Sequence, residues 1–415
     1  MMREEFTREQ LSEKADQYLK FLCHQLPNRR VGAEGNRLAT QFLADTLAGF
    51  GMSVQTPEFH CLDWVDRGAH LLTTSGHTFE VFSSPYTLPC NVNAPLVVAR
   101  TVDELDASQP ENAVLLLIGE LAQEQLMPKN FPFYNPEHHQ QIYQLLERTA
   151  PSAIITATAK NPELAGGMYP FPMIEDGDFD IPSVYMKDVD GEKLMRFAGE
   201  DVFLSIHSER IPASGHNVIA RTEAGRKPRI VLCAHIDAKD NTPGALDNGT
   251  GVVVLLLLGE MLQRYSGQIQ IELLALNGED HYSAQGHKAY IKDHQGKFED
   301  IFLAVNTDVA GYFEGPTAYS LYGCPEPVAS AIHQVMSKFE GLVEGEQWFQ
   351  SDHSVFIQQG CPAVAITSER FMELSTHITH TPKDDLNLVN FAKVADVAYA
   401  LKQVIDKLDQ LREPR

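Results

Sequence analysis

The sequence is poor in cysteine and in positive charge, and it has no long apolar run. Its six cysteines are scattered without a Cys-x-x-Cys pair, which argues against a disulfide framework or a thiolate zinc site and favours a reducing compartment. With 33 Lys+Arg against 56 Asp+Glu, the net charge of -23 repels nucleic acid and anionic membrane surfaces. The longest apolar run, residues 252–258, is far below the ~20 residues of a membrane span, and the charged N-terminus does not resemble a signal peptide. We therefore expect a cytoplasmic protein with no nucleic-acid or membrane partner.

Length and composition predict a folded chain of more than one domain. The 415 residues exceed the usual size of one core, and 43% hydrophobic with 21% charged residues is ordinary for a globular protein. Residues 6–26 and 36–50 have apolar positions at helical spacing. Residues 63–212 alternate short strand-like runs with Pro-rich loops, which indicates an inserted smaller α/β domain within a main domain of residues 1–62 and 213–415. A long decorated loop region of a single domain is the alternative.

The second half of the chain alternates strands with helices. Near-continuous apolar runs predict buried strands at residues 229–234, 269–276, 301–305 and 363–367. Helices are predicted at residues 249–265, 328–339 and 391–411. This alternation predicts an α/β fold, in which helices cover both faces of a mixed, largely parallel sheet.

Acidic and imidazole side chains follow these strands. Ligands of open α/β sheets bind beyond the carboxyl ends of the strands, which is where these groups fall. Taken singly, each has an ordinary explanation as a core histidine, a turn, a solvated loop or a helix N-cap. Their coincidence at successive strand ends predicts one site instead. The groups are His235, Asp237, Asp247, Glu279, Asp280, Asp308 and His380.

A cluster of carboxylates requires cations, because the charges repel and desolvate one another. Three aspartates and a bridging hydroxide would balance the charge of two Zn²⁺ ions. Ligands of the His/Asp type suit zinc first, with Co²⁺ or Mn²⁺ as substitutes. Glu279 and Asp280 are adjacent and diverge, so one can bind metal while the other serves as a base. Asp237 lies on the same side of an extended segment as His235 and can fix the tautomer of its ring.

These motifs together resemble those of the M28 family of zinc aminopeptidases. The resemblance covers residues 1–60 loosely and 215–412 well, and it implies a zinc-exopeptidase fold of the phosphorylase/hydrolase-like kind. It is carried by His235-x-Asp237, Pro-Gly-Ala-x-Asp247-Asn-Gly-x-Gly, Asn-Gly-Glu279-Asp280, Asn306-x-Asp308 and His380-Thr-Pro-x-Asp384.

The resemblance implies a role for each matching residue. His235 and Asp308 would hold one zinc, Asp280 and His380 the other, and Asp247 would bridge the two. It also implies a cis peptide bond after the bridging aspartate.

Two further residues would act beside the ions. By the resemblance, Glu279 would be the general base and Asp237 the partner of His235. The substrates would be peptides with a free N-terminus. The resemblance carries nothing on oligomeric state, which stays unknown.

The chain departs from the family pattern in two places. The family often has Glu-Glu where this chain has Glu279-Asp280, and Asp is one methylene shorter but still reaches a metal. The usual Gly-Leu-x-Gly-Ser is replaced by residues 281–287, which end in Gly286-His287 and leave substrate preference open. The insert resembles the protease-associated domain found in some of these peptidases, at residues 113–118, 151–155, 181–184 and 191–194.

Other readings stay open at this stage. A glutaminyl-cyclase-like acyl transferase with one zinc, a carboxypeptidase or dipeptidase, and a non-catalytic binding protein could share the fold. Ser351-Asp352-His353 predicts a helix N-cap, with a place at the rim of the site as the alternative, and Asp384 either orients His380 or caps a loop. The remaining histidine candidates are predicted to be polar surface or loop residues: His138, His139, His281, His287 and His377.

Overall fold

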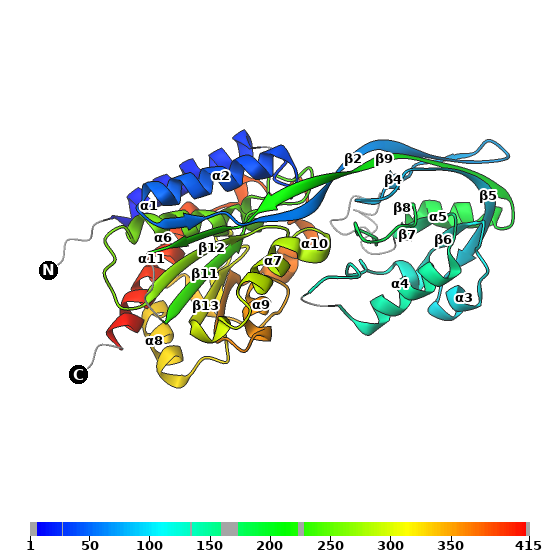
Figure 1. Ribbon diagram of the computed structural model, residues 1–415. Coiled ribbons are helices and arrows are strands. Elements are labelled where there is room, and N and C mark those ends of the chain that lie inside the picture. Colours follow the sequence, from blue (N-terminus) through cyan, green and yellow to red (C-terminus); the bar gives the residue numbers. More distant parts are fainter. Residues whose placement is uncertain (1–5, 27, 133–134, 159–172, 223–227, 412–415) are drawn as a thin grey trace. The chain divides into compact units, whose positions relative to one another are not determined.

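The computed structural model describes residues 6–26, 28–132, 135–158, 173–222 and 228–411 (Figure 1). The chain divides into two compact units. The first comprises Met1–Cys61, Ser214–Asp280 and Ala284–Arg415, and the second comprises Leu62–Ala213 and His281–Ser283. The division expected from the sequence put residues 1–62 and 213–415 in the first unit. The likeness of the second unit to a protease-associated domain stays a prediction.

The described residues of the first unit form a mixed eight-stranded sheet, as expected. Its four central strands are parallel, because the strands are joined through helices. They are, in spatial order, β12 (Gln270–Leu276), β11 (Arg229–His235), β13 (Ile301–Thr307) and β16 (Ala363–Ser368). Antiparallel pairing continues the sheet at both sides. Beyond β12 lie β10 (Val218–Arg221) and then β1 (Ser53–Gln55). Beyond β16 lies β14 (Thr317–Tyr322), and β15 (Leu342–Glu344), which pairs with β14, forms the edge.

Helices cover both faces of this sheet (Figure 1). On one face, alternate residues of the central strands share a core with α1 (Arg8–Lys20), α2 (Glu34–Gly49), α6 (Thr250–Met261), α8 (Glu326–Met336) and α11 (Phe391–Gln410). Helix α6 is buried along its whole length because it contacts the sheet, α1 and α11, which explains its apolar run.

The opposite face carries α7 (Gln285–Asp293) and α9 (His353–Gln358). There the rings of Tyr290 from α7 and Phe356 from α9 pack with centroids 6.1 Å apart. A further short helix, α10 (Phe371–His377), follows β16. Helices α7 and α10 were not expected from the sequence.

The second unit is built on its own eight-stranded sheet, again counted over described residues. The spatial order is β3 (Thr78–Phe79), β2 (Glu58–Thr73), β9 (Asp201–His216), β5 (Cys90–Ala99), β6 (Val114–Leu117), β7 (Ala153–Thr158), β8 (Ser183–Lys187) and β4 (Phe82–Ser83). Leu194 of α5 (Asp188–Leu194) joins the core on one face, while α3 (Val102–Ala107) and α4 (Glu137–Thr149) supply residues to the other core. Across both units, no helix among the described residues is long and apolar enough to cross a bilayer.

Candidate metal centre

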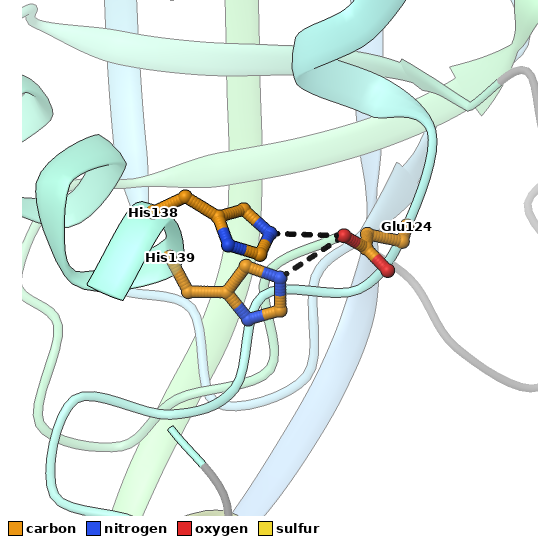
Figure 2. A group of neighbouring side chains, drawn as sticks. All are labelled: Glu124, His138 and His139. Carbon is orange, nitrogen blue, oxygen red and sulfur yellow. Dashed lines mark hydrogen bonds and ion pairs between the residues drawn. The ribbon is translucent and has the colours of Figure 1, made fainter. Parts of the chain in front are cut away.

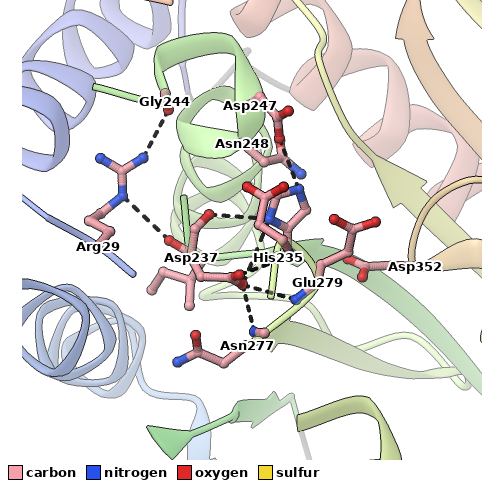
Figure 3. Close-up of polar contacts among 12 residues, drawn as sticks. Arg29, His235, Asp237, Gly244, Asp247, Asn248, Asn277, Glu279 and Asp352 are labelled. Carbon is pink, nitrogen blue, oxygen red and sulfur yellow. Dashed lines mark hydrogen bonds and ion pairs between the residues drawn. The ribbon is translucent and has the colours of Figure 1, made fainter. Parts of the chain in front are cut away.

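The structure brings the five predicted metal ligands together at the carboxyl end of the parallel strands. His235 is the last residue of β11, Asp308 directly follows β13, and Asp280 lies in the loop after β12. Asp247 precedes α6, and His380 follows α10. All five belong to the first unit, and Figure 3 shows His235 and Asp247 among their neighbours. The convergence follows from the parallel topology, since such strands end at one edge of the sheet.

Asp247 lies at the centre of the group, with one carboxylate oxygen facing each histidine. Its Oδ1 is 3.2 Å from His235 Nε2, and its Oδ2 is 3.0 Å from His380 Nε2. On the first side, His235 Nε2 is also 3.5 Å from Asp308 Oδ1. On the second side, His380 Nε2 is 2.8 Å from Asp280 Oδ1. The five side chains therefore form two sets of three that share Asp247.

These spacings fit cation binding. Ligands held about 2.0–2.2 Å from one tetrahedral ion lie roughly 3.3 Å apart, which is close to the separations within each set. Asp280 Oδ2 and Asp308 Oδ1 are buried and have no hydrogen-bond partner among the described residues. Buried acceptors of this kind are normally satisfied, so both point to a missing positive partner. Oxygen and imidazole donors without thiolate are those that suit zinc.

The shifted pKa values of the two histidines also show that positive charge is favoured within the cluster. Burial lowers the pKa of His380, but Asp280 and Asp247 outweigh it and raise the value to about 10. Burial likewise opposes charge on His235, whose pKa Asp308 and Asp247 nonetheless raise well above its usual value. Protons on the two imidazoles thus offset the buried carboxylates. Divalent cations would offset them more completely and would take the places of those protons.

Asp237 holds the loop that carries Glu279 and Asp280. Its carboxylate accepts backbone N–H groups from Gly278 at 2.7 Å, from Glu279 at 3.3 Å and from Asp280 at 3.1 Å (Figure 3). The ring of His235 is oriented differently from the expectation. Its Nδ1 lies 3.2 Å from the carbonyl oxygen of Asp237 and 3.8 Å from the carboxylate. The backbone carbonyl group of Asp237 therefore fixes the tautomer of His235, while the Asp237 carboxylate holds the loop after β12.

Glu279 projects beside the ligands without belonging to either set of three. Burial raises the pKa of its carboxyl group well above the usual value, although His235 opposes this, and the charges of Asp280, Asp308 and Asp352 raise the value further. A carboxyl group tuned upward in this way is suited to exchange protons near neutral pH.

The loop around Asp247 is fixed by residues from distant parts of the chain. The Asp247-Asn248 peptide bond is cis, as expected. Asp384 acts on the backbone beside Asp247, because its carboxylate accepts the N–H groups of Leu246 at 2.7 Å and of Asp247 at 3.0 Å. The loop-capping alternative for Asp384 therefore holds. Gly251 is needed next to this turn, because a Cβ there would lie 2.4 Å from the carbonyl oxygen of Thr307.

Arg29 is a contributor that the sequence did not reveal. Its guanidinium is buried and donates to the carbonyl oxygens of Leu22 at 3.0 Å, Pro243 at 2.8 Å and Gly244 at 2.8 Å. Figure 3 shows the contact with Gly244. Arg29 thereby ties the segment before Asp247 to the N-terminal helices. A lone arginine beyond a helix carries no sequence signal for such a role, since these three partners are backbone carbonyl groups.

The Ser351-Asp352-His353 segment does not cap α9. Asp352 is the N-cap residue but makes no side-chain capping bond, so the N-cap prediction was wrong. Ser351 Oγ instead donates to Asp308 Oδ2 at 2.7 Å, and Asp352 Oδ1 is 2.5 Å from His287 Nε2. His287 was also wrongly predicted as a surface residue, because it is fully buried in α7. The segment supports the centre from within the protein.

Another group of possible metal ligands lies in the second unit. The Nε2 atoms of His138 and His139, at the start of α4, are 3.1 Å and 3.2 Å from Glu124 Oε1 (Figure 2). His139 Nδ1, however, accepts the backbone N–H of Met127 at 3.1 Å. Its Nε2 therefore carries the proton and donates it to Glu124, which leaves no lone pair for a metal. His138 and His377 are exposed as predicted, whereas His139 and His281 are buried, which corrects the prediction for those two.

Comparison with known proteins finds similarity to one family over part of the chain. Residues 217–405 match Peptidase family M28. The chain is 26% identical over 315 residues to "Probable lipoprotein aminopeptidase LpqL" of Mycobacterium tuberculosis, an alignment that covers 72% of this chain and 60% of that protein. Its fold superimposes on BSAP, a zinc aminopeptidase from Bacillus subtilis, with a TM-score of 0.72 and 17% identity over 96% of this chain and 94% of that one. Glutaminyl cyclase of Porphyromonas gingivalis is more distant, with a TM-score of 0.52 and 13% identity over 96% and 98% of the two chains.

The part of the chain that carries the cluster is similar to a peptidase family, and the fold is similar to that of a zinc aminopeptidase. The family match covers residues 217–405, the part of the chain that contains all five predicted metal ligands. Its mycobacterial relative is matched over less than two thirds of that relative's own length.

Proposed function

We propose that the protein is an aminopeptidase that removes N-terminal residues from peptides with the help of two zinc ions. The observation that carries the proposal is the position of Asp247, whose two oxygens face His235 on one side and His380 on the other. A single carboxylate shared between two sets of ligands is the arrangement that two ions need. Co²⁺ or Mn²⁺ would serve as substitutes.

In this proposal each of the two sets of three holds one ion. His235, Asp247 and Asp308 would bind the first, and Asp247, Asp280 and His380 the second. When bound, zinc lowers the pKa of a coordinated water from ~15.7 toward ~7 and polarises the carbonyl group of the substrate.

Glu279 would act as the general base. It takes a proton from the attacking water and returns the same proton to the leaving amine, so a single side chain carries out both proton transfers. Asp237 keeps this base in place through the backbone N–H groups of Gly278, Glu279 and Asp280. Carboxylates around the site would favour the positively charged α-amine of a free N-terminus.

The proposal is tested by metal analysis combined with a set of blocked and unblocked substrates. We expect two zinc ions per chain and hydrolysis of aminoacyl amides, with no cleavage once the N-terminus is acetylated. Cleavage of N-blocked peptides from the free C-terminus would instead indicate a carboxypeptidase. One zinc per chain, with cyclisation of N-terminal glutamine, would indicate a glutaminyl-cyclase-like acyl transferase.

Glu279→Gln separates chemistry from metal binding. This variant should retain two zinc ions and lose hydrolysis by about 10²–10⁴-fold. Glu340→Gln, at an exposed position, is the matched control and should behave as the wild type. Full activity in Glu279→Gln would remove Glu279 as the base.

We also propose a reducing compartment such as the cytoplasm. No disulfide bond joins any of the six cysteines, all of which lie among the described residues, and this is typical of proteins kept in reducing surroundings. Fractionation of cells that express the full natural protein tests this, and a membrane-bound or secreted protein would contradict it.

A further inference from the structure

A buried histidine–aspartate pair lies next to the proposed base. His287 from α7 and Asp352 at the start of α9 are both fully buried, and His287 Nε2 donates to Asp352 Oδ1 at 2.5 Å. The two residues are 65 positions apart in the chain, so the contact depends on the packing of α7 against the region of α9. Burying an acidic group is costly unless it has a specific partner, and His287 is that partner.

The second oxygen of Asp352 is not used by the fold. Asp352 Oδ2 is buried and has no hydrogen-bond partner among the described residues, and the side chain does not cap α9. A carboxylate that is anchored through one oxygen and unsatisfied at the other requires an explanation. Because Oδ1 is bound to His287, Oδ2 is held in a fixed position in which it can accept a hydrogen bond.

The Asp352 side chain lies near Glu279. Figure 3 shows the two side chains next to each other, and the charge of Asp352 raises the pKa of the Glu279 carboxyl group. Ser351 holds the segment on its other side through Asp308 Oδ2 at 2.7 Å. Asp352 is therefore fixed from two directions, by His287 and by the backbone next to Ser351.

We propose that His287 and Asp352 form a positioning pair for Glu279. The inference rests on the proposed function, in which Glu279 is the base. Once Glu279 has taken the proton from the attacking water, its O–H donates to Asp352 Oδ2. This bond orients the protonated carboxyl group until the proton passes to the leaving amine. One proton moves from water to Glu279 and then to the amine, and neither Asp352 nor His287 gains or loses one.

The pair involves a residue from the segment that departs from the family pattern. His287 stands where the usual Gly-Leu-x-Gly-Ser segment ends in serine. The imidazole of His287 reaches Asp352, which gives this one position of the segment a reason in the structure.

The experiment compares zinc-loaded full-length variants by kcat, KM and zinc content. Asp352→Asn and His287→Leu should each lower kcat by about 10–100-fold while KM stays within about twofold and two zinc ions are retained. His287→Gln, which keeps an N–H donor, should recover most of the loss seen in His287→Leu. His294→Gln is the matched control, because His294 is a buried histidine at the end of the same helix with no place in the proposed machinery.

A double-mutant cycle tests whether the pair acts through Glu279. In the Glu279→Gln background, adding Asp352→Asn should cause no further loss of the residual rate. An added loss of tenfold or more would overturn the proposal, as would unchanged kcat in Asp352→Asn. Loss of zinc together with kcat would also overturn it, since that is the outcome of a purely structural role. Thermal unfolding of every variant identifies those that fail to fold, and His287→Gln then provides the test.

The two proposals fail in different ways. If the wild type binds no zinc, or if Glu279→Gln keeps full activity, the proposed function fails. If Glu279→Gln abolishes hydrolysis and Asp352→Asn does not alter kcat, only the positioning pair fails.

Discussion

Asp384 holds the backbone of Asp247, although the two residues are far apart in the chain. The Asp384 carboxylate accepts the N–H of Asp247 at 3.0 Å and that of Leu246 at 2.7 Å. A side chain from the His380 loop thus sets the position of the proposed bridging ligand. We expect Asp384→Asn to weaken zinc binding by about 10–100-fold, because its amide places a donor against one of these N–H groups. Competition with a chromogenic chelator measures this. Asp385→Asn, at a neighbouring residue that pairs with His24, should bind zinc as the wild type does.

Asp237 should matter through the loop it holds. Its carboxylate accepts three backbone N–H groups, and an asparagine cannot accept all three. We expect Asp237→Asn to lower kcat/KM by about 10²-fold or more, since small displacements of a catalytic group are costly. The steady-state rate on an aminoacyl amide measures the effect, with Asp293→Asn as an exposed control. A wild-type rate would show that the loop keeps its position without this carboxylate.

Arg29 should contribute chiefly to stability. Replacement by methionine removes the donor to three carbonyl oxygens and leaves them buried without a charged partner. We expect a loss of about 3 kcal/mol in the free energy of unfolding, measured by urea titration. Arg67→Met is the control, because Arg67 is an exposed residue that pairs with Glu209. A change below about 0.5 kcal/mol in Arg29→Met would contradict this account.

The lowered pKa of His353 predicts how the free energy of unfolding depends on pH. Burial lowers its pKa to about 4, although its contact with the carbonyl group of Trp348 opposes the shift. The folded chain therefore binds this proton less tightly than the unfolded chain, whose histidine has a pKa of about 6.5. The stability that comes from this neutral imidazole is complete above pH ~6.5 and is lost as pH falls toward ~4. The loss is on the order of 3 kcal/mol.

The pH prediction requires a matched variant, because carboxylates also titrate in acid. Urea unfolding of the metal-free wild type and of His353→Asn is compared at pH 7.5, 6 and 5. The wild type should lose more stability than His353→Asn between pH 7.5 and 5. Parallel losses in the two proteins would assign the acid sensitivity to other groups.

The Glu124 cluster should not bind zinc. The Met127 N–H occupies Nδ1 of His139, and the proton on Nε2 of that ring is donated to Glu124. A third zinc would have to displace this proton. We expect two zinc ions in the wild type and the same number in Glu124→Gln, measured by elemental analysis after dialysis. Three ions in the wild type and two in Glu124→Gln would refute the tautomer assignment.

Much of the first unit could be predicted because its chemistry is local to strand ends. The buried strands were apparent as apolar runs, and in a parallel sheet their ends meet, so His235 and Asp308 had to lie near each other. The cis bond at Asp247-Asn248 was predicted only through the family resemblance. Cis bonds that do not precede proline are rare, and an Asp-Asn pair in a sequence does not mark one.

The contacts that sequence reasoning missed are those between side chains and distant partners. Arg29 binds carbonyl oxygens, which every residue has, and Asp384 binds backbone N–H groups. His287 looked like a loop residue because α7 has no strong apolar period before Tyr290. The extent of β2 and β9 was missed since charged residues interrupt their alternation.

The place where the chain leaves and re-enters the first sheet has a consequence for how the protein can change. β1 and β10 are hydrogen-bonded neighbours, with Val54 opposite Ala220, and everything between them in the sequence leads into and out of the second unit. A tight hairpin could join two such strands, which lie about 4.7–4.9 Å apart. The sheet is therefore continuous without help from the inserted residues. The insert could be lengthened, replaced or removed while every strand around the proposed metal ligands keeps its pairing.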